Sequence, residues 1–407
     1  FEVTGSDFPA RYDFNDQPPV PFVSWVIGAT APINPSDLFA NSVEFQPVED
    51  AGLPPGNWVL QAVVGGSDCD ENGIPDDCDV ANGAPDCNNN LLPDACELPT
   101  QDCNLNGLLD DCDILDGTSQ DLDGDNIPDE CPLTFIDVPS LAPTIQAAIA
   151  AAGTGTTVRV ADGTYVENIN LLGKAITLTS VNGPMSTIID GSNGGPTVEI
   201  SALVGPDTVV EGFTITGGTG RPSDGGGGIL ILGSPTIRGN IIRENHTDGY
   251  GGGILAFGPS SPIIINNTIE NNSALKGGGF HAQVDNTLST VSNNIIRNNA
   301  CTEDNGGGIY FQNGTLYLSN NQIVGNTAPD SGGGVFVVNS GNLPSQLIGN
   351  QIVGNQSGSN GGGLWMRTSN PVIANNLIHG NSSESGGGVF LEESGSFINN
   401  TVVNNFG

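Results

Sequence analysis

From about Thr134 to its end, the chain alternates short apolar runs with polar turns, and this pattern recurs at a fixed period. Glycine triplets mark the repeats and begin 25 to 29 residues apart, at positions 226, 251, 277, 306, 332, 361 and 386. A repeat this short cannot bury its own apolar face. The pattern therefore predicts coils stacked as a parallel β-solenoid, with neighbouring strands about 4.8 Å apart.

Three apolar positions of each repeat are expected to form columns inside the solenoid, each residue lying over its copy in the next coil. The first column follows the triplets: Ile229, Ile254, Phe280, Ile309, Val335, Leu364 and Val389. The second contains Ile237, Ile264, Val291, Leu318, Leu347, Ile373 and Phe397. The third contains Ile242, Ile269, Ile296, Ile323, Ile352, Ile378 and Val402.

Two asparagines five residues apart recur at a fixed phase between the triplets. We expect them to lie at corners, in left-handed backbone geometry, and to hydrogen-bond their copies in the next coil. The pairs are Asn240 with Asn245, Asn267 with Asn272, Asn294 with Asn299, Asn321 with Asn326, Asn350 with Asn355, Asn376 with Asn381, and Asn400 with Asn405.

An amphipathic helix is expected over 144–152, where it would cap the first coil. With its sequence IQAAI at 145–149 and GTY at 163–165, this segment resembles the start of right-handed parallel β-helix proteins. The glycine triplets and asparagines resemble the repeats of polymorphic outer-membrane proteins. The resemblance covers 134–407 and implies an all-β fold class, a right-handed parallel β-helix, without implying one activity.

Residues 68–132 are too polar to close a hydrophobic core, and they repeat a calcium-loop pattern four times. Oxygen ligands at loop positions 1, 3, 5, 9 and 12, with a backbone carbonyl at position 7, suit calcium. The expected ligands of the first loop are Asp68, Asp70, Asn72, Ile74, Asp76 and Asp79. The second loop has Asp86, Asn88, Asn90, Leu92, Asp94 and Glu97; the third has Asp102, Asn104, Asn106, Leu108, Asp110 and Asp113. The fourth has Asp121, Asp123, Asp125, Ile127 and Asp129, with Pro132 at position 12.

The loops begin 16 to 19 residues apart, at positions 68, 86, 102 and 121. That spacing is too short for a helix on each side of every loop, which argues against EF-hands and helix-bearing dockerin modules, so we expect the loops to stack directly. Affinities of about 10⁻⁴ to 10⁻³ M are typical of extracellular calcium modules. The pattern resembles thrombospondin type 3 repeats over 68–131, which implies a calcium-filled stalk. The alternative is a disordered acidic linker that binds calcium diffusely.

Six cysteines at loop positions 2 and 11 are expected to be structural: Cys69, Cys78, Cys87, Cys96, Cys103 and Cys112. Disulfides within a loop and disulfides between neighbouring loops both fit the spacing, and Cys131 and Cys301 are candidates for unpaired thiols. Regularly spaced cysteines of this kind indicate an oxidising compartment, so we expect an extracellular or cell-surface protein.

The chain carries 45 acidic and nine basic residues, a formal net charge of -36. Such charge disfavours nucleic acid and anionic membranes as partners, and the lack of a run of eighteen apolar residues predicts no membrane insertion. Short β-type runs predict a small β module over 1–66, so the expected domains are 1–66, 67–132 and 133–407. Because the chain begins with Phe1, we expect that a signal peptide has been removed.

No catalytic site is expected. Polysaccharide lyases need clustered basic residues, whereas Arg243, Glu270 and Arg297 share one phase of successive repeats and predict a charge ladder. Glycosidases need paired carboxylates. The three histidines, His246, His281 and His379, lie far apart in the sequence and are expected at the surface.

The sequence therefore predicts a secreted calcium-binding structural protein of the cell surface or of an extracellular filament. Because the chain stops directly after a repeat, at Gly407, we expect head-to-tail self-assembly. An adhesin or carbohydrate-binding β-helix protein that contacts surface glycan is the second hypothesis. A polysaccharide lyase or glycoside hydrolase is the third.

Overall fold

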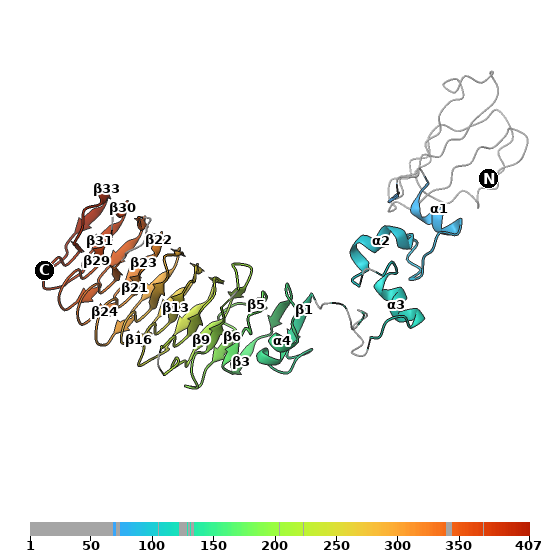
Figure 1. The fold of residues 1–407 in the computed structure, drawn as a ribbon, viewed down its shortest axis with the longest axis horizontal. Coiled ribbons are helices and arrows are strands. Elements are labelled where there is room, and N and C mark those ends of the chain that lie inside the picture. The colour runs from blue at the N-terminus through green and yellow to red at the C-terminus, as the bar shows by residue number, and fades with distance from the viewer. Residues whose placement is uncertain are drawn as a thin grey trace, which may run out of the picture. The chain divides into compact units, whose positions relative to one another are not determined.

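The computed structural model describes residues 68–121 with gaps at 71–73 and 105, residues 128 and 131, and residues 134–407 with gaps at 203, 223, 339–343 and 369. The side chain of Thr100 is also outside this description. The chain divides into two compact units, Phe1–Pro132 and Leu133–Gly407 (Figure 1). The β module predicted over 1–66 lies outside the described residues.

In the described part of the first unit, three short helices follow the predicted loops: α1 (Asp76–Ala81), α2 (Asp94–Gln101) and α3 (Asp110–Asp116). Each begins at loop position 9, and its first turn carries two or three acidic residues, which the positive end of a helix dipole favours. The sequence did not predict these helices, and α1 and α2 begin within the first and second loops and extend two and four residues past them. One or two helical turns fit into a spacing that excludes longer helices.

The second unit is a parallel β-solenoid whose three long sheets contain eleven, ten and nine strands among the described residues (Figure 1). The first sheet contains β1 (Phe135–Val138), β2 (Thr157–Val160), β5 (Thr177–Ser180), β8 (Val209–Glu211), β11 (Thr236–Arg238), β14 (Ile263–Ile265), β18 (Leu288–Ser292), β22 (Thr315–Ser319), β26 (Gln346–Ile348), β30 (Val372–Ala374) and β33 (Ser396–Ile398). The second contains β3 (Gly163–Val166), β6 (Thr187–Asp190), β9 (Thr214–Thr216), β12 (Ile241–Arg243), β15 (Thr268–Glu270), β19 (Ile295–Arg297), β23 (Gln322–Val324), β27 (Gln351–Val353), β31 (Leu377–His379) and β34 (Thr401–Val403).

The third sheet contains β4 (Ile169–Asn170), β7 (Val198–Ile200), β10 (Ile229–Ile231), β13 (Ile254–Gly258), β17 (Phe280–Val284), β21 (Ile309–Gln312), β25 (Val335–Val338), β29 (Leu364–Arg367) and β32 (Val389–Leu391). A short fourth sheet contains β16 (Ser273–Ala274), β20 (Ala300–Cys301), β24 (Thr327–Ala328) and β28 (Gln356–Ser357). The solenoid has about nine turns.

All three predicted apolar columns are confirmed by the strand register. Ile242 pairs with Ile269, and Ile269 with Ile296, in successive coils of the second sheet. The first sheet aligns Ile237 with Ile264, and the third sheet aligns Ile229 with Ile254. The columns form one continuous core in which most side chains are fully buried. Each coil therefore buries its apolar face only against its neighbours.

The two asparagine ladders are also confirmed. The Oδ1 atom of Asn299 accepts hydrogen bonds from the backbone N and Nδ2 of Asn272, both at 3.0 Å. Its own Nδ2 donates to the backbone oxygen of Ile269 at 2.9 Å and to Oδ1 of Asn326 at 3.0 Å. Because every buried donor and acceptor of the amide is used, these asparagines stabilise the corners.

The expected left-handed geometry of the ladder asparagines is wrong. The positive φ belongs to the preceding residue, such as Asn298 (φ 54°) before Asn299 and Asn271 (φ 55°) before Asn272. The chain turns at that residue, where asparagine or glycine tolerates the strain, and the next asparagine directs its amide inward.

Glycine is required at two positions of each triplet, for two different steric reasons. The first glycine, as in Gly251 (φ 65°), adopts the left-handed region at the corner. The third lies against the next coil, so that a Cβ at Gly253 would come within 2.6 Å of the Gly279 carbonyl oxygen. Glycine is needed there because backbones of adjacent coils approach closely.

Helix α4 (Ile145–Ala151) packs against β1, β2 and β4, as expected for a cap on the first coil. Thr144 caps its N-terminus by accepting a hydrogen bond from the Ala147 N–H. The Glu167 carboxylate accepts from the N–H groups of Ile145 and Gln146, both at 3.0 Å. At the other end, Lys174 Nζ donates to the carbonyls of residues 149, 150 and 152 at 2.7 to 2.9 Å. Charges of the solenoid thus hold both ends of the helix dipole.

Candidate metal-binding loops

In the third loop, 102–113, the side chains of positions 3 and 5 converge on the carboxylate of position 12. Asp113 is fully buried, and its Oδ2 accepts hydrogen bonds from Asn104 Nδ2 at 3.0 Å and Asn106 Nδ2 at 2.8 Å. Its Oδ1 is buried and has no hydrogen-bond partner in the part of the chain that the structure describes. Asp102, at position 1, accepts backbone N–H bonds from Asn106 and Gly107. The loop is thus folded around its acidic groups.

The second loop, 86–97, repeats this arrangement with glutamate at position 12. Glu97 is only 4 % exposed, and its carboxylate accepts hydrogen bonds from Asn90 Nδ2 at 2.9 Å and Asn88 Nδ2 at 3.4 Å. Asp86 accepts from the backbone N–H groups of Asn90 and Leu91. Two loops of different sequence therefore place positions 1, 3, 5 and 12 alike.

The first and fourth loops are described in part. In the first, Asp76 is 2 % exposed, its Oδ1 accepts from the Cys69 N–H at 2.8 Å, and its Oδ2 has no hydrogen-bond partner. Asp68, Asp70, Ile74 and Asp79 lie in the described part of this loop, whereas Asn72 is outside it. Of the fourth loop, Asp121 is described, and the predicted ligands Asp123, Asp125, Ile127 and Asp129 lie outside the described residues.

The residues present fit a hard divalent cation. In the second and third loops the amides of positions 3 and 5 converge on the carboxylate of position 12, and buried carboxylate oxygens of Asp76 and Asp113 have no hydrogen-bond donor among the described residues. A buried carboxylate oxygen without a donor or a cation is unfavourable by several kcal/mol. Calcium takes six to eight oxygen ligands of these kinds.

Three disulfides connect neighbouring loops among the described residues: Cys69–Cys96, Cys87–Cys112 and Cys103–Cys131. Each joins position 2 of one loop to position 11 of the next, so the pairing is between loops and not within them. The suggestion that Cys131 is unpaired is wrong, because it pairs with Cys103. Cys78 takes part in none of these three bonds, and burial raises the pKa of its thiol.

Each disulfide lies beside an aspartate at loop position 9. Asp76, Asp94 and Asp110 each have a carboxylate oxygen within 4.8 Å of both sulfurs of one disulfide. Each also accepts the N–H of the cysteine at position 2, at 2.8 to 2.9 Å. Burial raises the pKa of Asp110 above its ordinary value. Because the sulfurs are bonded to each other and are not thiolates, these groups do not form a soft-metal site.

The basic residues of the second unit are mostly occupied. Arg297 forms the predicted ion pair with Glu270 at 2.5 Å. Arg243 aligns with Glu270 in the strand register, but it forms no ion pair within the described residues, and its Nε is buried without a hydrogen-bond partner. The other ion pairs join Arg159 to Asp137, Arg221 to Glu199, Arg238 to Glu211, Lys276 to Asp304, and Arg367 to Glu392.

The expectation that all three histidines lie at the surface is wrong for His281. Its ring is 1 % exposed and is stacked between Tyr250 and Tyr310, with centroid distances of 5.0 and 4.5 Å. Neither ring nitrogen has a hydrogen-bond partner, and burial, aided by the nearby charge of Lys276, lowers the pKa of His281 to about 3. The sequence signal was its phase, because His281 aligns with the aromatic Tyr310 of the next coil. His246 is exposed and His379 is half-buried.

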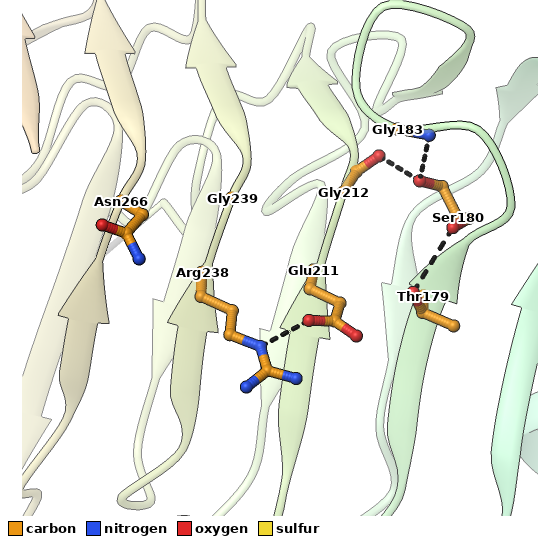
Figure 2. A pocket seen from close by; sticks show the side chains of 8 residues that line it. All are labelled: Thr179, Ser180, Gly183, Glu211, Gly212, Arg238, Gly239 and Asn266. Carbon is orange, nitrogen blue, oxygen red and sulfur yellow. Dashed lines mark hydrogen bonds and ion pairs between the residues drawn. The ribbon is translucent and has the colours of Figure 1, made fainter.

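A shallow hollow lies where β5, β8 and β11 end, with a volume of about 260 Å³. Figure 2 shows Arg238 reaching toward Glu211, and Ser180 bonded to the backbone of Gly212 and Gly183. A second hollow, of about 590 Å³, shares Thr179 and Ser180 with the first and contains the Arg159–Asp137 pair. Both hollows present hydrogen-bonding groups whose charges are already paired.

Two comparisons with known proteins bear on the second unit. Residues 185–356 match the family described as right handed beta helix region. No curated protein matches the chain. In the described residues, no helix has the length and apolar character needed to cross a membrane. The resemblances to thrombospondin type 3 repeats and to polymorphic outer-membrane proteins remain predictions. The unit Leu133–Gly407 is therefore a right-handed parallel β-helix, a fold that serves both enzymes and non-enzymes.

Proposed function

We propose that this chain is an extracellular calcium-binding structural protein, in which disulfide-linked calcium loops precede a rigid β-helix in the sequence. The buried carboxylate of Asp113 carries the proposal. It is fully buried, one oxygen has no partner, and the other meets the amides of Asn104 and Asn106. A bound cation would compensate the cost of burying that charge.

The charge of the loop segment supports the same proposal. Residues 68–132 contain 19 acidic residues and neither lysine nor arginine. Carboxylates crowded in this way repel one another unless cations lie among them. The two asparagine amides of the second loop and of the third can turn their oxygens toward such an ion, because rotation about the last side-chain bond exchanges oxygen and nitrogen.

In the third loop the residues that would hold calcium are Asp102, Asn104, Asn106, Asp110 and Asp113, with the carbonyl of Leu108. When bound, the ion supplies positive charge and fixes the loop's shape. The chain's own part is to keep the carboxylates together, through the backbone bonds to Asp102 and the disulfides. The proposed role is structural, since a fixed loop needs no turnover.

An extracellular location is supported by the three disulfides between loops, because such bonds persist outside the reducing cytoplasm. A structural role is supported by the solenoid's basic residues, most of which are held in ion pairs or, for Lys174, in the cap of α4. A lyase needs such charges free to meet its substrate. Self-assembly remains a prediction, and light scattering of the calcium-loaded chain tests it.

Isothermal titration calorimetry on the full chain tests calcium binding. Asp113→Asn removes the buried charge and is expected to weaken or abolish one site. Asp111→Asn is the matched control, because Asp111 is exposed and is at no ligand position of the loop. Equal calcium binding by both variants, or no binding by the unmodified chain, would contradict the proposal.

Carbohydrate binding is the second candidate function, and the two adjoining hollows, each of which contains an arginine–carboxylate ion pair, favour it. Their carboxylate and guanidinium groups form ion pairs, which hold these planar groups in fixed positions. Such groups can hydrogen-bond to the hydroxyls of a sugar. A glycan array with the unmodified chain and with Arg238→Ala tests this function. Binding that the variant does not weaken would exclude these hollows as its site.

A further inference from the structure

We infer that the three disulfides couple neighbouring calcium loops, so that calcium protects these bonds from reduction and reduction weakens calcium binding. The inference rests on the proposed calcium function and adds a regulation of the same loops by redox conditions.

Two of the disulfides, Cys69–Cys96 and Cys87–Cys112, are attached next to ligand positions of two different loops, and Cys103–Cys131 is attached next to ligand positions of the third loop. In the central bond, Cys87 lies between Asp86 and Asn88 of the second loop, while Cys112 directly precedes Asp113 of the third. The two cysteine Cα atoms are 5.8 Å apart. Cys69–Cys96 links the first loop to Glu97 of the second in the same way. A change in the ligands of one loop therefore reaches the next through a few covalent bonds.

The aspartate at position 9 provides a second link. Asp94 accepts the N–H of Cys87 at 2.9 Å, and its carboxylate lies within 4.8 Å of the sulfurs of Cys87 and Cys112. The same contacts recur for Asp76 and Asp110. A predicted calcium ligand thus lies beside the disulfide in each of the three cases. Three repeats of one geometry, in loops of different sequence, indicate a built arrangement.

Reduction breaks this link by exchange with a dithiol. The reductant attacks one sulfur and becomes a cyclic disulfide, and its two electrons and two protons leave both cysteines as thiols. The calcium-free loops then gain conformations that binding must remove again. Because coupled equilibria are reciprocal, the factor by which reduction weakens calcium binding equals the factor by which calcium resists reduction.

The experiment equilibrates the full chain in dithiothreitol buffers of increasing reducing strength, with saturating calcium or with magnesium. Thiols are then trapped by alkylation and assigned to each cysteine by peptide mass spectrometry. Calcium is expected to shift the reduction midpoint of the three disulfides by roughly 5- to 150-fold in the reductant ratio, the range typical of coupled sites. Cys301, a buried thiol of the other unit, is already reduced and serves as the internal reference. Its alkylation should be the same with calcium and with magnesium.

Two variants locate the coupling. Asp113→Asn should remove calcium protection from Cys87–Cys112 and reduce it for Cys103–Cys131, while Cys69–Cys96 keeps its shift. Asp111→Asn, one residue from Cys112, should behave like the unmodified chain. Loss of the shift in both variants, or in neither, would overturn the inference.

Calorimetry separates this inference from the function on which it rests. If the oxidised chain binds calcium and its disulfides are reduced equally with and without the ion, the coupling is overturned and the calcium function stands. If the oxidised chain binds no calcium, the proposed function fails, and the coupling fails with it.

Discussion

A single side chain of the asparagine ladder uses all of its hydrogen-bonding capacity. Asn299 is fully buried, and its amide and backbone bridge three successive coils. Its neighbour Asn298 is exposed and provides only the positive φ of the corner. Adjacent asparagines in one repeat therefore have different roles, which a mutation can separate.

Asn299→Leu is expected to lower the free energy of unfolding by about 3 kcal/mol, because it leaves buried polar groups of two coils without partners. Asn298→Gly should change it by less than about 1 kcal/mol, since glycine accepts the same φ. Urea denaturation followed by circular dichroism measures both. A ladder variant as stable as its neighbour would show that the amides are not needed.

The ladder also makes a prediction about N-glycosylation. Asn245, Asn355 and Asn381 stand in Asn-x-Ser/Thr motifs, yet they are at most 1 % exposed, and each Nδ2 donates two hydrogen bonds. A glycan on any of them would break the ladder. Secretion from a glycosylating cell should therefore yield folded chain free of glycan at these three sites, and mass spectrometry checks this. A folded chain with a glycan there would contradict the structure.

His281 gives the second unit a defined sensitivity to acid. Its pKa is lowered from 6.5 to about 3 in the folded chain, so the unfolded chain binds the proton more readily. The protonation of His281 therefore leaves the free energy of unfolding unchanged above pH 6.5 and lowers it as the pH falls from 6.5 to 3. By pH 4 the loss reaches about 3 kcal/mol, at 1.36 kcal/mol for each pH unit.

His281→Phe should remove this loss, because Phe336 and Phe390 already occupy the same column in other coils. The difference in unfolding free energy between the two chains is measured at pH 7 and at pH 4, so that effects of the carboxylates cancel. A difference that does not change with pH would contradict the buried, neutral ring.

Among the helices and strands, those with a repeating apolar pattern could be predicted from the sequence, and the short helices could not. The strands were predictable because apolar residues recur with the period of the coil, and each lies in the expected register. The short helices α1, α2 and α3 were not expected, since one or two turns leave no hydrophobic period to detect. The disulfide pairing was not predictable, because both alternatives give the same spacing.

Helix α4 supplies the test at this scale. Lys174→Met removes the three hydrogen bonds to the C-terminal carbonyls of α4 and should cost about 1 to 3 kcal/mol. Hydrogen exchange of the α4 amides should accelerate first. Arg297→Met is the control. It removes the ion pair between the exposed Arg297 and Glu270 and should lower the free energy of unfolding by less than about 1 kcal/mol. Equal effects would show that the cap is not held by Lys174.

At the scale of the whole molecule, the two units are stabilised by different means. The β-helix buries a continuous apolar core, whereas residues 68–121 have few buried apolar side chains in their described part and depend on disulfides and folded acidic loops. The sequence predicted this division because 68–132 combines 19 acidic residues with regular cysteines. Which carboxylates are buried could not be predicted, since loop spacing does not report exposure.

The number of calcium ions that the chain retains shows whether the acidic loops hold the ion. Native mass spectrometry of the oxidised chain, after dialysis against millimolar calcium, counts them. At least three ions are expected, one for each of the loops 68–79, 86–97 and 102–113, and Asp113→Asn should lose one of them. A chain that retains none, or that loses none in the variant, would contradict the account.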